Sequence, residues 1–312
     1  MAQLEYQDLA PLARLTRAGI NESFHSGVAT LVDKSGQLIE SLGNTPKPIY
    51  PRSAIKPIQA FVMRELGLEL SGEELVITMA SHAGTQAHVE LVNTVLAQAG
   101  LDESSLLCPV AFPSNPAARA LVTQKTTTQM NCSGKHAGFL ATAKLNGWST
   151  KNYLDLDHPL QQGILVKLEL WSGEEVSVST QDGCGAPLFA ISTLGLAKAM
   201  ATFAQHDQVL MATAKSNPWV IGDHESPDAV FLEHGIMAKI GAEGVFIGIT
   251  DSGHSVAVKI ADGSIRAAPA VAAKLLLNHK LISESVFQDI FERTSPKVLG
   301  GNYETGQLAV EL

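Results

Sequence analysis

The chain has 312 residues, of which 45% are hydrophobic and 17% charged, and its formal net charge is −9 at pH 7. Such a chain can bury a large core, and without a linker rich in Pro, Gly or Ser we expect one domain over residues 1–312. The acidic balance, with no run of Lys and Arg, argues against a nucleic-acid partner. No apolar run is long enough to span a membrane, and the N-terminus lacks the pattern of a secretory signal. Three cysteines are too few for a disulfide framework, so we expect a reduced, cytoplasmic protein.

The first and last thirds of the chain are rich in β-prone residues. Residues 28–32 and 37–42 predict two strands, joined by a tight turn at residues 33–36. Near the other end, "GVFIGITDSGHSVAVKIADGSIRAAP" predicts strand, turn, strand, turn and a short strand, with turns at residues 251–253 and 262–263.

The middle of the chain is helical in pattern. Gly100, Gly147 and Gly173 stand where helix C-caps belong. Apolar residues recur at helical spacing in five stretches: "AIKPIQAFVMREL", "AHVELVNTVLAQAG", "KHAGFLATAKLNG", "HPLQQGILVKLELWSG" and "PLFAISTLGLAKAMATFAQ". The whole pattern predicts an α/β structure with one antiparallel sheet flanked by helices and a helical subregion beside it.

The stretch "PRSAIKPIQA" places Ser53 three residues before Lys56 at the start of a helix. Residues three apart share a helix face, so Oγ and Nζ can touch. A neutral lysine can activate a serine as a nucleophile. Ser53 is equally well explained as a helix N-cap, so the pattern alone leaves both interpretations open.

Three other polar residues follow or interrupt apolar segments. Ser81 comes after the apolar run 75–80 and just before Gly84, where it can point into a cleft or simply cap a turn. Lys239 is predicted to open a strand, with Lys259 on the partner strand of the same hairpin. A lysine in an apolar strand usually faces solvent, so these two matter only if their face borders a cleft.

Two cysteines occur in polar turns that precede helices. Cys132 is followed four residues later by His136, a spacing that suits two metal ligands on one helix face. Cys184 lies between two glycines, before a helix predicted to begin at Pro187. Two thiolates from separate segments favour a soft divalent ion such as zinc, and a redox pair is the competing interpretation.

Ser-x-x-Lys at a helix start, a second serine and Lys-x-Gly on a late strand, in that order, resemble the serine β-lactamase, penicillin-binding and glutaminase superfamily. Together with "RAGINESFHSGVATLVDKSG", "ASHAGTQAHVE", "NCSGKHAGFL", "DGCGAP" and "KIGAEGVF", they resemble the rhizobial-type L-asparaginase family, asparaginase II. The resemblance runs from about Arg17 to about Ala267. It implies a serine β-lactamase-like fold, a homodimer, and hydrolysis of L-asparagine to L-aspartate and ammonia.

The resemblance also implies roles for individual residues. It implies two serine–lysine pairs, Ser53 with Lys56 and Ser81 with Lys259, with Ser53 expected as the nucleophile. It implies a zinc ion held by Cys132, Lys135 and Cys184, which moves the third-ligand role from His136 to Lys135. The residues expected to contact substrate are Arg52, His136, Asp182 and Lys239.

Other functions fit parts of the same pattern. A glutaminase or a penicillin-recognising serine hydrolase would share the fold and Ser-x-x-Lys, but neither is expected to carry both cysteine motifs. An alternative of another class is a non-catalytic protein that binds zinc or an amino acid. The threonine-nucleophile signatures expected of other asparaginase types are not seen.

Overall fold

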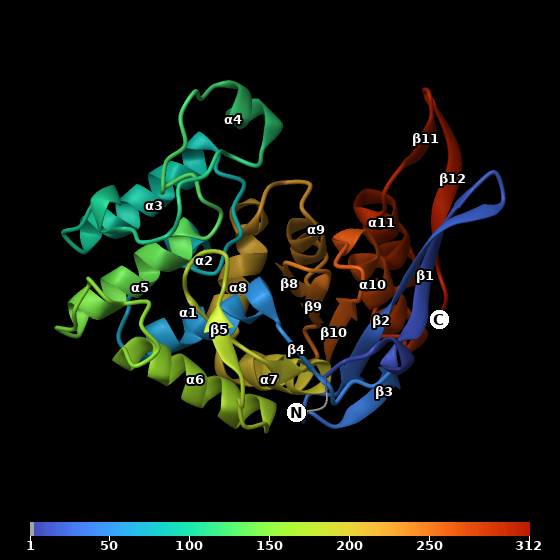
Figure 1. Ribbon diagram of the computed structural model, residues 1–312, viewed down its shortest axis with the longest axis horizontal. Coiled ribbons are helices and arrows are strands. Elements are labelled where there is room, and N and C mark those ends of the chain that lie inside the picture. Colours follow the sequence, from blue (N-terminus) through green and yellow to red (C-terminus); the bar gives the residue numbers. More distant parts are fainter. Residues whose placement is uncertain (1–2) are drawn as a thin grey trace.

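A computed structural model describes residues 3–312, and these form an α/β structure around one antiparallel sheet (Figure 1). Within this part of the chain the sheet has eight strands, in the order β11-β12-β1-β2-β10-β9-β8, with β3 paired to β2. Their bounds are β1 (Ala10–Arg17), β2 (Ile20–Val32), β3 (Leu38–Leu42), β8 (Met237–Gly241), β9 (Val245–Ile249), β10 (Ser255–Ile260), β11 (Val298–Gly300) and β12 (Tyr303–Val310). Two small ladders lie outside this sheet: β4 (Pro48–Ile49) with β7 (Ile191–Ser192), and β5 (Ser179–Gln181) with β6 (Pro187–Phe189).

The two predicted hairpins meet at the centre of the sheet. β2 pairs antiparallel with β10, with Leu31 opposite Val256 and Ala29 opposite Val258. Residues 27–32 of β2 are buried on both faces, which is why this segment reads as a nearly continuous apolar run. The prediction that the chain returns to its first strands is therefore confirmed.

The helices lie on both faces of the sheet and form a separate layered region beside it (Figure 1). The α-helices are α1 (Lys56–Glu65), α2 (Gly72–Ile77), α3 (Gln86–Gln98), α4 (Pro116–Ala120), α5 (Ser133–Leu145), α6 (Pro159–Ser172), α7 (Thr193–His206), α8 (Gln208–Ser216), α9 (Pro227–Glu233), α10 (Ala268–Asn278) and α11 (Glu284–Thr294). The 3-10 turns are η1 (Tyr6–Asp8), η2 (Arg52–Ile55), η3 (Glu103–Ser105), η4 (Pro218–Ile221) and η5 (Ile265–Ala267).

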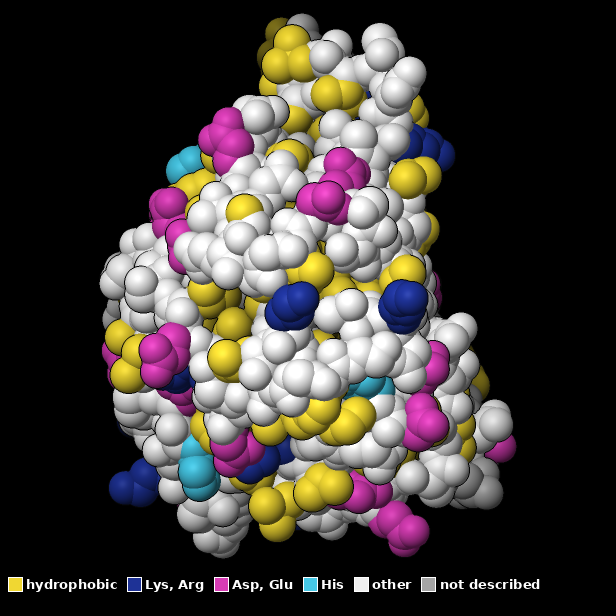
Figure 2. Space-filling model, turned by 90° about the vertical axis from the view of Figure 1, so that its left-hand side faces the viewer, with side chains coloured by type: hydrophobic (Ala, Val, Ile, Leu, Met, Phe, Trp, Pro, Cys, Tyr) yellow, Lys and Arg dark blue, Asp and Glu magenta, His cyan; other side chains and the backbone are white. Residues whose placement is uncertain are grey.

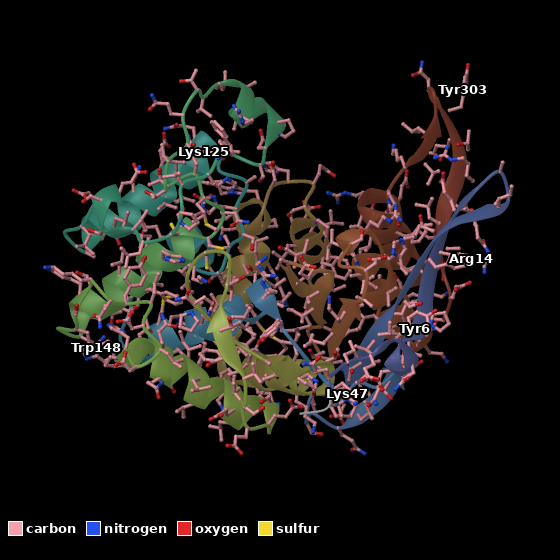
Figure 3. The ribbon with its side chains drawn as sticks, in the orientation of Figure 1. Tyr6, Arg14, Lys47, Lys125, Trp148 and Tyr303 are labelled. Atoms are coloured by element: carbon pink, nitrogen blue, oxygen red, sulfur yellow. The ribbon has the colours of Figure 1, made fainter. Side chains whose placement is uncertain are left out.

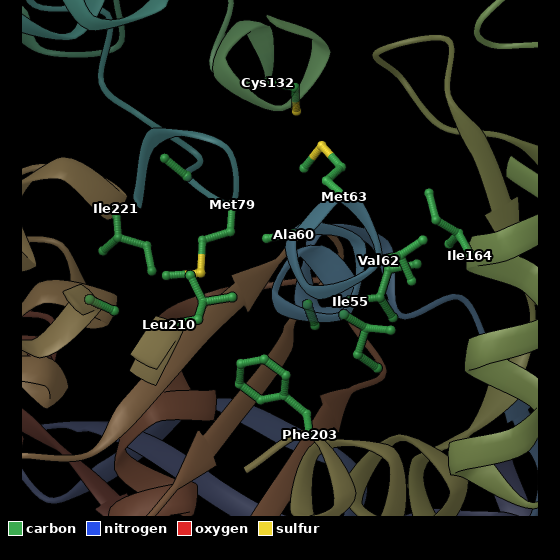
Figure 4. Close-up of a cluster of buried hydrophobic side chains, with 14 of the residues drawn as sticks. Ile55, Ala60, Val62, Met63, Met79, Cys132, Ile164, Phe203, Leu210 and Ile221 are labelled. Atoms are coloured by element: carbon green, nitrogen blue, oxygen red, sulfur yellow. The ribbon is translucent and has the colours of Figure 1, made fainter. Parts of the chain in front are cut away.

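The faces of the sheet contribute to two hydrophobic cores. Successive strand residues point to opposite faces, so Ile247 joins one core and its neighbour Phe246 the other. The first core continues into the helical region, where α1 runs through its middle between Phe203 and Cys132 (Figure 4). This position buries the first residues of α1 and fixes the positions of their side chains.

One predicted helix begins later than expected. The stretch from Pro187 continues as two short buried strands, β6 and β7, and α7 begins only at Thr193. The apolar residues of this stretch, whose spacing predicts a helix, pair instead as strands: β6 with β5 and β7 with β4. Ser192 then caps α7, because its side chain accepts a hydrogen bond from the N–H of Gly195.

Two predictions at the late strands are wrong. The segment after residues 262–263 is not a short strand, since Ser264 caps the 3-10 turn η5 and the alanine-rich helix α10 follows. Lys239 and Lys259 are not hairpin partners either. Lys239 lies in the middle of β8 and Lys259 on β10, and β9 separates the two strands.

The outer strands extend into a ribbon beyond the body of the structure. The β11–β12 turn is at its end, with Tyr303 at the tip and Arg14 further down on β1 (Figure 3). Ile20, Phe24 and Tyr303 are exposed along this ribbon.

The surface of the helical region carries mixed charge. The face in Figure 2 shows isolated Lys and Arg side chains among acidic and apolar ones, without a basic stripe. Across residues 3–312, no helix combines the length and apolar character needed to cross a membrane.

Candidate active site

The turn that carries Ser53 is tightly constrained. Pro51 precedes η2, and Pro57 stands in the first turn of α1. Arg52 has φ +53°, a left-handed conformation that an arginine adopts only when its surroundings hold it there. β8 packs directly on this turn, because a Cβ added to Gly241 would come within 2.5 Å of the Pro51 carbonyl oxygen. Only glycine permits this approach, which places the end of β8 beside Ser53.

Lys56 is the buried basic group of the site. Its side chain is 1% exposed, and Nζ donates hydrogen bonds to the Ala80 carbonyl and, at 3.0 Å, to Ser81 Oγ. Burial lowers the pKa of Lys56 to about 8, and the positive charge of Lys239 adds to this effect. A lysine with such a pKa is partly neutral near physiological pH and can accept a proton.

Ser81 is fixed by its backbone neighbours. Its N–H donates to the Ile221 carbonyl, and the N–H of His82 donates to the Asn131 carbonyl. The segment thereby bridges η4 and the loop before α5. Its half-buried hydroxyl lies where the Lys56 ammonium reaches it.

The expected pairing of Ser81 with Lys259 differs from the structure. Lys56 is the partner of Ser81, whereas Lys259 Nζ donates to the carbonyls of Glu243 and Ile260. Lys259 instead lines an open pocket of about 590 Å³ whose other walls include Tyr50. Burial lowers the pKa of Lys259, against the attraction of Glu243.

The late-strand lysine beside Lys56 is Lys239. It is completely buried, so its expected contact with a substrate has no opening in this structure. Nζ lies 2.8 Å from Asp228 Oδ2, in an ion pair that is also completely buried. Sequence reasoning missed Asp228, because "SPDAVF" reads as an ordinary helix start with an acidic first turn.

Arg52, in the turn that carries Ser53, forms a second ion pair with Asp182. Arg52 Nε donates to Asp182 Oδ1 over 2.6 Å, and the same oxygen accepts from the N–H of Gly183. The pKa of Asp182 is lowered although burial alone would raise it, because Gly183, Lys135 and Arg52 stabilise the carboxylate. Both side chains keep some exposure, so a polar ligand can reach them.

The predicted metal ligands converge. Lys135 Nζ lies 3.2 Å from Cys184 Sγ. The interaction between the two thiols lowers the pKa of Cys184 to about 4 and raises the pKa of Cys132 to about 12, and Cys132 Sγ itself donates to Asn131 Oδ1. Among residues 3–312, no group of three or more His, Cys, Asp and Glu residues is placed to hold a metal. A metal site here would therefore need Lys135 as a ligand.

His136 lies beside this cluster with one nitrogen unused. The Tyr153 hydroxyl oxygen accepts a hydrogen bond from the Leu107 N–H. The same hydroxyl lies 2.8 Å from His136 Nδ1, within hydrogen-bond distance. His136 Nε2 is buried without a hydrogen-bond partner. Burial lowers the pKa of His136 to about 3, which favours the neutral ring.

The comparisons with known proteins bear on the whole chain. The family model for L-asparaginase II matches residues 13–310. The chain belongs to the L-asparaginase II family. This membership confirms the resemblance seen in the sequence and makes the chain an amidohydrolase with a small-molecule substrate.

Two solved structures are distant likenesses of this L-asparaginase II family member. A β-lactamase from Mycobacterium bovis shares 14% identity over 81% of this chain and 94% of its own, with a TM-score of 0.37. A mutant of the Streptomyces K15 DD-transpeptidase shares 13% identity over 82% of this chain and 97% of its own, with a TM-score of 0.43. Scores this low support no argument about chemistry, and no curated protein matches the chain.

Proposed function

We propose that this protein is an L-asparaginase that works through a seryl ester intermediate. The observation that carries the proposal is the buried contact between Lys56 Nζ and Ser81 Oγ, next to the turn that holds Ser53. A lysine with a pKa of about 8 that contacts a serine hydroxyl suits removal of a serine proton. Family membership supports an amide as the bond that is cleaved.

In the proposed first step, Ser53 attacks the side-chain amide carbon of L-asparagine. Neutral Lys56 takes the hydroxyl proton as the Oγ–C bond forms, and negative charge develops on the carbonyl oxygen. The proton then passes from Lys56 through Ser81, its hydrogen-bonded neighbour, to the amide nitrogen. The C–N bond breaks, ammonia leaves, and an aspartyl ester remains on Ser53.

Water completes the reaction in the second step. Lys56, again neutral, takes a proton from the water that attacks the ester carbon. The C–Oγ bond breaks, the proton returns to Ser53, and L-aspartate leaves. Each proton taken by Lys56 is returned, so the cycle balances.

Arg52 and Asp182 suit the recognition of the substrate's charged groups. A guanidinium binds an α-carboxylate, and a carboxylate binds an α-ammonium. Their ion pair holds both groups in place before substrate binds, which reduces the entropy lost on binding.

Asp182→Asn should therefore raise the KM for L-asparagine by about tenfold and change kcat much less, because the lost contact serves binding. Steady-state ammonia release checks this. Asp223→Asn, at another partly exposed carboxylate, is the matched control and should leave KM unchanged. A variant in which only kcat falls would remove Asp182 from substrate binding.

Zinc is the metal that the cysteine cluster would hold. The donor set suits zinc, because the pKa of Cys184 is lowered to about 4, which favours its thiolate, and Lys135 Nζ lies 3.2 Å from its Sγ. When bound, zinc would supply a positive charge and an open coordination position for an oxygen ligand. Lys135 would have to lose its proton to coordinate, which makes metal affinity depend on pH.

Replacing Cys184 by serine tests this metal site. Purified protein should contain zinc, and C184S should lose it because a hydroxyl is a far weaker ligand than a thiolate. Elemental analysis measures both. Cys108→Ser controls for loss of a buried thiol, since Cys108 hydrogen-bonds the Thr127 carbonyl and is not part of the proposed ligand set. Wild-type protein without zinc, or C184S with its full content, contradicts the proposed site.

An ammonia assay with L-asparagine and L-glutamine, beside a chromogenic β-lactam, tests the proposed function. We expect hydrolysis of L-asparagine at the highest kcat/KM. Faster turnover of L-glutamine or of the β-lactam would favour the glutaminase or penicillin-recognising alternative.

A further inference from the structure

Asp228 occupies an unusual place behind the site. It lies in the first turn of α9, is 1% exposed, and uses both carboxylate oxygens. Oδ2 accepts from Lys239 Nζ over 2.8 Å, and Oδ1 accepts from the N–H of Ile240 over 2.6 Å. The Asp228 side chain therefore binds both the Lys239 ammonium and the backbone of β8.

These two contacts lie at the edge strand of the sheet, which α9 covers. β8 is the last strand in the sheet order, so its outward N–H groups have no neighbouring strand to bind. Asp228 fills that place at Ile240, one residue before Gly241. α9 lies along β8 in Figure 1 and supplies this contact from outside the sheet.

The far side of the same strand end meets the catalytic turn. Gly241 packs against the Pro51 carbonyl, β8 packs on η2, and the positive charge of Lys239 helps to lower the pKa of Lys56. A displacement of β8 would therefore reach both Ser53 and Lys56.

We propose that Asp228 is a positioning residue of the active site, which holds Lys239 beside Lys56 and the end of β8 against the turn that carries Ser53. This rests on the proposed function for its role in turnover, while the positioning itself rests on the contacts above. A buried carboxylate with a buried lysine partner is costly to keep, since charges leave water only at a free-energy cost. Burial raises the pKa of Asp228, against the attraction of Lys239.

Asp228→Asn is the informative variant. An asparagine can still accept from the Ile240 N–H, but it leaves the Lys239 ammonium without its counter-charge. Asp207→Asn is the matched control, because Asp207 is also buried, with Arg64 as charged partner and the Leu210 N–H as backbone partner. Asp207 is the N-cap of α8, and its partner Arg64 is at the opposite end of α1 from Lys56.

We expect D228N to lose about 100-fold in kcat with KM changed by less than about threefold, as for loss of a group acting only on the chemical step. D207N should lower Tm but keep kcat within about threefold of wild type. In a double-mutant cycle, D228N should cost nothing further in the background of K239M, because Asp228 acts through Lys239. Should D228N fail to fold, the double variant D228N/K239M, which removes both charges together, serves in its place and should fold and lose activity.

The rate at which a fluorophosphonate labels the active-site serine gives a second readout that needs no amide substrate. Wild type that labels but leaves L-asparagine intact contradicts the proposed function alone, and slow labelling of D228N would still support the positioning role. D228N with wild-type kcat and labelling rate, full additivity with K239M, or an equal loss of kcat in D207N would overturn it.

Discussion

Replacing Lys56 by methionine should lower kcat for L-asparagine hydrolysis by about 10³-fold, because it removes the base that hydrogen-bonds Ser81. Methionine fills the buried space without a charge, so the fold should survive. In wild type, kcat/KM should rise with pH and level off above about 8, since only neutral Lys56 accepts the serine proton. At pH 7 roughly a tenth of the molecules would carry neutral Lys56.

Lys259→Met is the comparison that separates the two pairings. Lys259 donates to backbone carbonyls at the edge of a pocket, away from Ser81, so its loss should cost far less than the loss of Lys56. A pH profile of kcat/KM for wild type and K259M, with single-point rates for K56M, checks both statements. Equal losses in the two variants would restore Lys259 as the partner of Ser81.

The two serines should respond differently to alanine. Ser53→Ala removes the proposed nucleophile and should lower kcat by more than about 10³-fold, whereas Ser81→Ala removes a proton relay and should cost about 10²-fold. Both residues are half-buried, so Tm should change little in either variant. Ammonia release and thermal unfolding measure these effects.

A larger loss of kcat in S81A than in S53A would assign the role of nucleophile to Ser81. Near-normal turnover in S53A, with S81A inactive, would make Ser81 the nucleophile, and its direct bond to Lys56 would then be the activating contact. Ser172→Ala is a suitable control, because Ser172 is a buried serine at the end of α6 that bonds only within its own helix end.

Local pattern predicted the parts of the fold that local contacts determine. The turn at residues 33–36 and the caps at Gly100, Gly147 and Gly173 need particular backbone conformations, and the structure has them. The strand β12 escaped prediction, because much of it is exposed and its pairing partner β1 is almost three hundred residues away. β6 and β7 fall in a stretch whose spacing predicts a helix, because a short apolar run does not distinguish the helical period from the strand period.

In the candidate site, too, spacing predicts the local relations, whereas the contacts between distant segments depend on tertiary packing. Ser53 and Lys56 lie three residues apart at a helix start, so spacing predicts that their side chains are near each other. The serine that Lys56 hydrogen-bonds in the structure is Ser81. The partner of Ser81 depends on how α1 packs in the core, and no spacing reveals it. Lys239 and Asp228 meet only because α9 lies against the edge strand β8, so neither the ion pair nor its place behind Lys56 is visible in one sequence.

Identification of the serine that carries the acyl group tests the mechanism most directly. Enzyme mixed with L-asparagine, quenched in acid during turnover and digested, can be searched by mass spectrometry for a peptide that carries an aspartyl ester. We expect the ester on the peptide that contains Ser53, accumulating further in S81A. An ester on Ser81, or none in an enzyme that turns over, would contradict Ser53 as the nucleophile.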